Sequence, residues 1–153
     1  MVRAEFGVEV EFESPGGMHL PILAGPVTRA MLADLDQRPY TIVTFRMRGS
    51  EIRRFVQRSK PVASGLRYRM FCGRLEEITV GGAPLDDARV YSCAGSSALA
   101  GRLEGFETLE MRDTKRLGSD VVIAALRKAG TMAPAYDGRR VVADTLRTGI
   151  RPE

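Results

Sequence analysis

The strict alternation of apolar and acidic residues near the start of the chain constrains the fold most. Residues 7–13 read Gly-Val-Glu-Val-Glu-Phe-Glu, so Val8, Val10 and Phe12 face one side of an extended segment and three glutamates face the other. The pattern stops at residues 14–17, Ser-Pro-Gly-Gly, where proline removes a hydrogen-bond donor and the glycines permit positive φ. We therefore predict a half-buried strand with one wet face.

The rest of the chain mixes strand and helix patterns. Further strands are expected at about 40–48, 66–71, 75–80 and 89–94, the middle two forming a tight hairpin. Helices are expected at about 28–35, 50–59 and 119–129, the second with Ile52, Phe55 and Val56 as its apolar stripe. The hairpin argues against a purely parallel sheet, so we predict an α+β fold with a mixed β-sheet and packed helices. At 153 residues the chain is expected to be a single domain, 1–153, with an ordered core at about 7–146.

The ends of the helices carry their own signals. Thr28 and Ser50 are predicted to cap the first two helices, because a hydroxyl at this position accepts a hydrogen bond from the first turn. Gly130 is predicted to stop the third helix. Cys72 and Cys93 each lie in a strand-like apolar stretch, so reduced, buried thiols are expected; a disulfide would need their strands to be neighbours.

Arginine dominates the basic residues of a chain with net charge +4, since only Lys60, Lys115 and Lys128 are lysines among 23 Lys and Arg. Arginine suits bidentate pairing with phosphate or carboxylate, so an anionic ligand and a compositional bias are both open explanations. One group lies on an expected strand and helix that point its members in several directions: Arg46, Arg48, Arg53, Arg54 and Arg58. We interpret it as a solvated face rather than a phosphate-facing patch. The aromatic residue among them, Phe55, belongs to the apolar stripe of the expected helix and offers no exposed stacking platform, so nucleic-acid binding is not expected.

The sequence offers little material for independent catalysis. It holds one histidine, His19, and no cluster of His, Asp and Cys at metal-ligand spacing, so no metal is expected in this chain. A phosphate-binding loop and a nucleophile elbow are likewise missing from the sequence. No run of 18 apolar residues predicts a membrane span, and residues 1–13 show no signal-peptide pattern.

Several short motifs follow one another along the chain. They are Ser-Pro-Gly-Gly-Met-His at 14–19, Ala-Gly-Pro-Val-Thr at 24–28, Ala-Ser-Gly-Leu-Arg-Tyr at 63–68, Gly-Ala-Pro-Leu-Asp at 82–86 and Pro-Ala-Tyr-Asp-Gly-Arg at 134–139. In this order they resemble the carboxy-terminal domain of the 5'-nucleotidase and UDP-sugar hydrolase family. Each motif is weak alone, but their order and spacing cover about residues 8–141. In the family a helix precedes the first strand, and only residues 1–6 stand in its place, so we expect the chain to begin partway through a larger architecture.

The resemblance implies a substrate-recognition domain. In the family, two divalent metal ions in a separate amino-terminal domain perform phosphoester hydrolysis, while the carboxy-terminal domain stacks the base between two aromatic rings. The expected partners are a nucleotide or another phosphorylated small molecule and a metallophosphoesterase domain in cis or in trans. Members are often periplasmic, secreted or surface proteins, but the compartment of this chain stays open.

The positions that correspond to the family's ligand-binding residues have changed. They fall at Ser14, Gly16, Gly17, His19, Ile42, Ala98 and Glu104. Ser14 and His19 replace an Asn and an Arg, Ile42 and Ala98 replace the two aromatic rings, and Glu104 replaces an Asp that holds ribose hydroxyls. Tyr40 or Phe106 would have to supply a ring if stacking is retained. We therefore predict a recognition domain that is inactive alone and has shifted specificity; the alternative is a degenerate, non-catalytic binding or interaction domain.

Overall fold

The computed structural model describes residues 1–15, 25–35, 39–133 and 138–143. Its helices are α1 (Val2–Phe6), α2 (Arg29–Leu35), α3 (Gly49–Ser59), α4 (Ser97–Ala100) and α5 (Gly118–Ala129), with a 3-10 turn at Gly101–Leu103. The strands are β1 (Val10–Glu13), β2 (Thr41–Arg48), β3 (Val62–Ser64), β4 (Leu66–Phe71), β5 (Arg74–Val80), β6 (Ala83–Pro84), β7 (Val90–Ser96), β8 (Thr108–Leu117) and β9 (Arg140–Ala143). The predicted α+β class is therefore confirmed.

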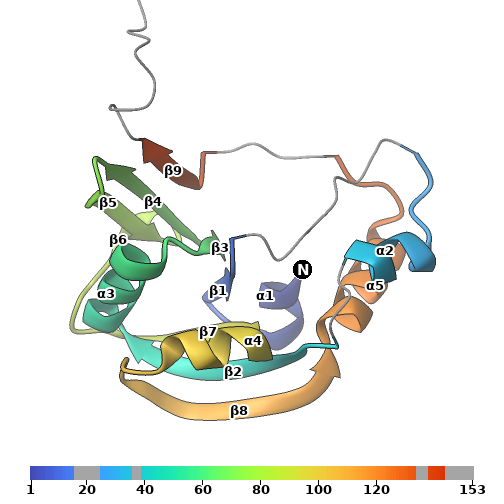
Figure 1. Cartoon of the computed structure of the whole chain (residues 1–153), viewed down its shortest axis with the longest axis horizontal. Coiled ribbons are helices and arrows are strands. Elements are labelled where there is room, and N and C mark those ends of the chain that lie inside the picture. The colour runs from blue at the N-terminus through green and yellow to red at the C-terminus, as the bar shows by residue number, and fades with distance from the viewer. Residues whose placement is uncertain (16–24, 36–38, 134–137, 144–153) are drawn as a thin grey trace, which may run out of the picture.

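The strands form two mixed sheets. The larger has the order β3-β1-β7-β2-β8, and the smaller has the order β6-β5-β4-β9. In the larger sheet β1 and β7 run parallel, with Phe12 opposite Gly95, and in the smaller sheet β4 and β9 run parallel. The other strand pairs among the described residues are antiparallel. The predicted hairpin is β4–β5. Figure 1 shows α3 between the two sheets at one end of the molecule and α2 beside α5 at the other.

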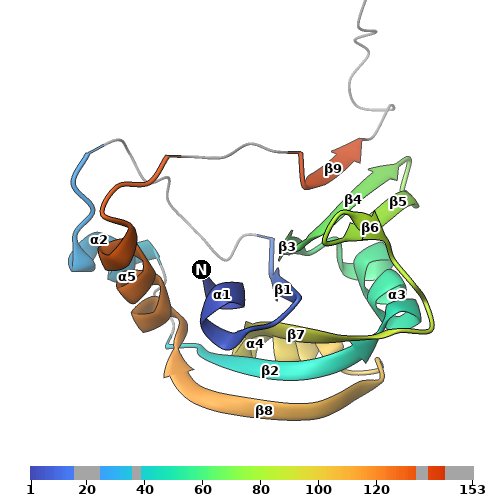
Figure 2. The ribbon, with the colours of Figure 1, turned by 180° about the vertical axis from the view of Figure 1, so that it is seen from behind.

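Helix α3 is the centre of the main core. Its predicted apolar stripe, Ile52, Phe55 and Val56, is fully buried. The Phe55 ring meets the Phe12 ring edge-on at 5.3 Å between centroids, which joins α3 to the first sheet. The view from behind in Figure 2 again places α3 against both sheets, and the helix packs on β2 and on β5. The alternation therefore aims Val10 and Phe12 at this helix. Val8 precedes β1 and packs against the small cluster of Ile42, Ala94 and Val121, so its predicted place on the same face is wrong.

The start of α3 differs from the prediction. The helix begins at Gly49, and no side chain caps it, so the assignment of Ser50 as the cap is wrong. Instead the backbone N–H of Gly49 donates to the Arg89 carbonyl at 2.8 Å, and that of Ser50 donates to the Asp87 carbonyl at 3.0 Å. Glycine is needed here because a Cβ at residue 49 would collide with the Asp86 backbone. A remote loop therefore satisfies the donors that a hydroxyl was expected to satisfy.

The predicted start of α2 and the predicted end of α5 agree with the structure. Thr28 does cap α2, its Oγ1 accepting from the Met31 N–H at 3.2 Å. Gly130 ends α5 with φ 70° and donates to the Leu126 carbonyl at 2.9 Å. The side chain that α5 buries is Val121, in a small cluster with Ile42 and Ala94 on the sheet face opposite α3.

Strand β8 was not predicted. It runs for 10 residues along the edge of the larger sheet, and most of its side chains are exposed, so it lacks the alternation by which the other strands were found. Glu110 and Lys115 have positive φ, and the register with β2 shifts along its length. Such bulges interrupt the free edge of a strand and discourage pairing with other chains. In the described part of the chain, every helix is too short or too polar to span a bilayer.

Candidate functional site

The parallel pairing of β1 and β7 brings two of the predicted site segments together. Because the two strands are parallel neighbours, their carboxyl ends lie side by side. Ser14 therefore follows β1 at the place where Ser96 leads from β7 into α4. The Glu13 side chain connects them, since its Oε1 accepts from the Ser96 hydroxyl at 3.0 Å and from the Ser14 N–H at 2.7 Å. Ala98 lies in the helix that follows Ser96 and is partly buried.

The position of Ile42 is different. Its side chain is only 4% exposed and packs with Ala94 and Val121, so it presents almost no surface to a ligand. Ser96 lies opposite Ile42 in the β2–β7 register. Ile42 is therefore close to the segments of Ser14 and Ala98, but its side chain is covered by its neighbours. Gly16, Gly17 and His19 lie outside the described residues. The assignments of Ile42, Gly16, Gly17 and His19 as ligand-binding positions stay predictions.

Glu104 lies at an open hollow of about 600 Å³ between the end of α3 and the 3-10 turn. The hollow is lined by Arg58, Ser59, Gly101, Arg102, Glu104 and Gly105. Gly95 in β7 lets α4 pack closely on the sheet, because a Cβ there would collide with the Leu99 side chain and with the Phe12 carbonyl. This packing fixes the segment that carries Arg102 and Glu104 against the sheet.

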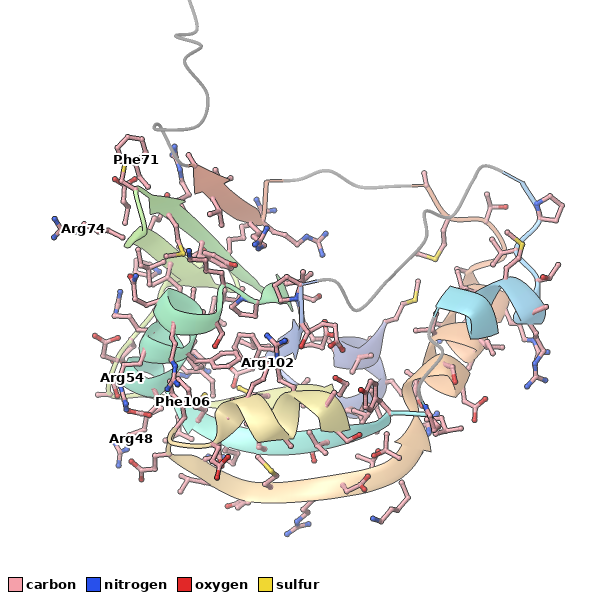
Figure 3. The ribbon with its side chains drawn as sticks, viewed as in Figure 1. Arg48, Arg54, Phe71, Arg74, Arg102 and Phe106 are labelled. Atoms are coloured by element: carbon pink, nitrogen blue, oxygen red, sulfur yellow. The ribbon has the colours of Figure 1, made fainter. Side chains whose placement is uncertain are left out.

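Phe106 lies beside this hollow but is not a free ring. Its edge-to-face contact with Phe55, at 5.4 Å between centroids, attaches it to the core. The guanidinium carbons of Arg54 and Arg58 lie 5.4 and 5.7 Å from its centroid, within the range of cation–π attraction. Figure 3 shows Arg54 next to Phe106 and Arg102 on the same side of the molecule.

The arginines at 46–58 diverge, in agreement with the interpretation as a solvated face. Arg46 pairs with Glu110 at 3.4 Å, Arg53 with Asp87 at 3.0 Å, and Arg54 with Glu51. Arg58 differs, because it lines the hollow together with Arg102. Sequence reasoning did not bring these two arginines together, because they lie more than 40 residues apart in the chain.

The wet face of β1 carries an unusual carboxyl group. Glu11 lies between Ser64 of β3 and Ala94 of β7 in the strand register. Burial, together with the neighbouring Glu13, raises the pKa of Glu11 from 4.5 to about 7, and the chain's amino group, Arg139 and Arg3 offset only part of this rise. Glu11 is therefore not fully solvated, although the alternation predicted it on a solvent-exposed face.

The cysteines do not form a disulfide. Cys93 is buried in the main core, where burial and the charge of Glu9 raise its pKa well above the ordinary value. Cys72 is exposed in the β4–β5 turn, so its expected burial is wrong. It occupies the turn with φ 45°, outside the strand to which its apolar neighbours assigned it.

No three His, Cys, Asp or Glu side chains in the described ranges gather closely enough to hold a metal ion. The family model for the 5'-nucleotidase C-terminal domain matches residues 1–111. The chain belongs to this family. That match starts at α1 and reaches into β8, so it includes both walls of the hollow.

Solved structures agree with this assignment at the level of the fold. A 5'-nucleotidase precursor from Thermus thermophilus superposes with a TM-score of 0.81 at 19% identity, over 92% of this chain and 32% of that one. Haemophilus influenzae NAD nucleotidase superposes with a TM-score of 0.75 at 20% identity, over 90% of this chain and 30% of that one. A Thermus thermophilus sulfate thiohydrolase superposes with a TM-score of 0.68 at 24% identity, over 99% of this chain and 32% of that one. The chain thus spans about a third of each structure; no curated protein sequence matches it.

Proposed function

We propose that this chain is the substrate-recognition domain of a 5'-nucleotidase-like phosphoester hydrolase. The observation that carries the proposal is the hollow at Glu104, because the family resemblance assigns ribose recognition to this position. Two arginines, a hydroxyl and a carboxylate line the hollow, and polar groups of this kind orient a small ligand.

Hydrolysis would depend on a metallophosphoesterase domain supplied in cis or in trans. Two adjacent divalent metal ions stabilise the attacking and leaving oxygens of a phosphoester, and they need several carboxylate and histidine ligands. The described residues offer no such group, and the matched structures are about three times longer than this chain. The metal ions are therefore expected in the partner domain.

The test combines this chain with a two-metal phosphoesterase domain, either fused upstream or added in trans. Release of inorganic phosphate from nucleotides and sugar phosphates is then measured with and without the chain. We expect release that requires both parts and is weakened when Glu104 is replaced by alanine. Failure of every substrate with a metal-loaded, folded partner would instead support the alternative of a non-catalytic binding domain.

A further inference from the structure

We propose that the hollow selects a phosphorylated polyol, such as a sugar phosphate, rather than a nucleobase. The proposal rests on the proposed function of the hollow as the ligand site and names its ligand class. In this assignment Arg58 and Arg102 hold the oxyanion, and Glu104 accepts hydrogen bonds from hydroxyl groups.

The first argument is that base stacking has no platform here. Among the described residues, no aromatic side chain lines the hollow. The nearby ring of Phe106 is engaged edge-on by Phe55 and is also contacted by Arg54 and Arg58. Of the two positions where the family stacks its rings, Ala98 has no ring and Ile42 is buried. A base entering the hollow would therefore lack the contribution to affinity that stacking on an aromatic ring provides.

The second argument is the charge of the lining. Arg58 has its ring contact with Phe106 but no carboxylate partner among the described residues, and Arg102 has no ion-pair partner there either. By contrast, nearby Arg53 and Arg54 are both paired with carboxylates. Two guanidinium groups without carboxylate partners at one hollow form a suitable site for a phosphate, which accepts bidentate hydrogen bonds from each.

The third argument is the single carboxylate. Glu104 on the 3-10 turn side and the Ser59 hydroxyl on the α3 side add an acceptor and a donor to the two cations. A carboxylate repels a bare phosphate but accepts hydrogen bonds from vicinal hydroxyl groups. Gly101 and Gly105 complete the lining without side chains and leave room for a ring of sugar size. The lining therefore fits a molecule that carries both an oxyanion and hydroxyl groups.

The test is isothermal titration of the whole chain at about 0.15 M ionic strength, where exposed charges more than about 8 Å apart are largely screened. The probes are glucose 6-phosphate, glucose, inorganic phosphate and adenosine. We expect glucose 6-phosphate to bind more tightly than the other three. Arg102→Gln should weaken its binding about tenfold or more, because charge-assisted hydrogen bonds are lost.

Arg74→Gln is the matched control, since it removes the same charge from an exposed position at the β4–β5 turn. Figure 3 shows Arg74 far from Arg102. It should change the affinity less than about twofold, as a distant screened charge does. Glu104→Ala should weaken glucose 6-phosphate binding and leave inorganic phosphate binding unchanged or stronger. Circular dichroism of each variant verifies that it is folded.

The outcomes separate the two proposals. Adenosine binding as tightly as glucose 6-phosphate, with Arg102→Gln without effect, overturns the ligand class and leaves the recognition function standing. Equal losses in Arg102→Gln and Arg74→Gln, or inorganic phosphate binding as tightly as the sugar phosphate, also overturn it. If none of the four probes binds and the chain supports no hydrolysis with a metal domain, the proposed function itself fails.

Discussion

The two faces of the larger sheet are held in different ways. On the α3 side, aromatic and aliphatic residues of both sheets form one extensive apolar cluster around Phe55. On the opposite side, within the described part of the chain, the buried cluster is Ile42, Ala94 and Val121, with the partly buried Val2, Phe6 and Val8 packed against it, and polar contacts add to these apolar ones. Among these, Arg116 pairs with Glu5 and lies 5.5 Å from the Phe6 ring centroid, which holds α1 to the end of β8. The alternation in β1 contributes to this difference, because it sends Val10 and Phe12 to the α3 side and Glu11 to the other.

The largest effect is expected from Phe55→Ala. Its ring contacts both Phe12 and Phe106, so truncation removes apolar contacts from the sheet and from the wall of the hollow at once. We expect a loss of about 3–5 kcal/mol in the free energy of unfolding. Urea denaturation followed by circular dichroism measures it. A loss below about 1 kcal/mol would mean that α3 is not the centre of stability.

A smaller effect is expected from Val121→Ala on the opposite face. Removing two methyl groups from a fully buried side chain should cost about 1–2 kcal/mol, including the cavity left behind. Val142→Ala is the control, since Val142 is 40% exposed on β9 and should change stability by less than about 0.5 kcal/mol. If Val121→Ala lowers the free energy of unfolding as much as Phe55→Ala does, the contrast between the two faces is wrong.

Glu11→Gln tests the polar side of the comparison through pH. The pKa of Glu11 is about 7 in the folded chain, whereas the ordinary pKa of a glutamate is 4.5. The folded state therefore keeps a proton that the unfolded state loses between these pH values. The stability of the native chain should therefore fall as pH rises from about 4.5 to 7 and then level off. Glutamine cannot titrate, so the variant should be more stable at pH 8 by on the order of 1 kcal/mol, with the difference shrinking toward pH 4.5.

Urea denaturation at pH 5 and pH 8 gives this difference directly. Glu76→Gln, at an exposed position of β5, is the matched control and should leave the pH dependence unchanged. A stability difference in Glu11→Gln that is independent of pH would show that packing, and not ionisation, distinguishes the two side chains.

The smallest effect concerns the two thiols. Cys72 should react with a thiol reagent in the folded chain with almost no change in stability, because it lies exposed in the β4–β5 turn. Cys93 should react only as fast as the chain unfolds, since it is buried and its pKa is raised. Mass spectrometry after timed labelling distinguishes the sites. Rapid labelling of Cys93 would indicate that the main core opens locally.

Sequence reasoning succeeded where one face of an element is buried. The stripe of Ile52, Phe55 and Val56 and the alternation of Val10 and Phe12 leave a periodic record, and both were predicted. It failed at β8, because an edge strand with bulges and exposed side chains has no such period. It also failed at the start of α3, where distant backbone carbonyls replace a local cap.

The site was predicted less completely than the fold. Glu104 was found from the family resemblance and lies at the hollow, but Arg58 comes from α3, more than 40 residues away in the sequence. Only the tertiary fold brings these two side chains to one hollow. Ile42 could not be recognised as covered, because the α5 residue that buries it belongs to a different part of the chain.

The backbone hydrogen bonds at the start of α3 have a mechanical consequence. They join this helix to the loop that leads into β7, while the Glu107 N–H donates to Glu51 Oε2 at 3.1 Å and the Phe106 ring rests on Phe55. The two walls of the hollow are thus braced against each other. We expect the distance between these walls to change little on binding, so that a ligand finds its contacts already aligned and less conformational entropy is lost.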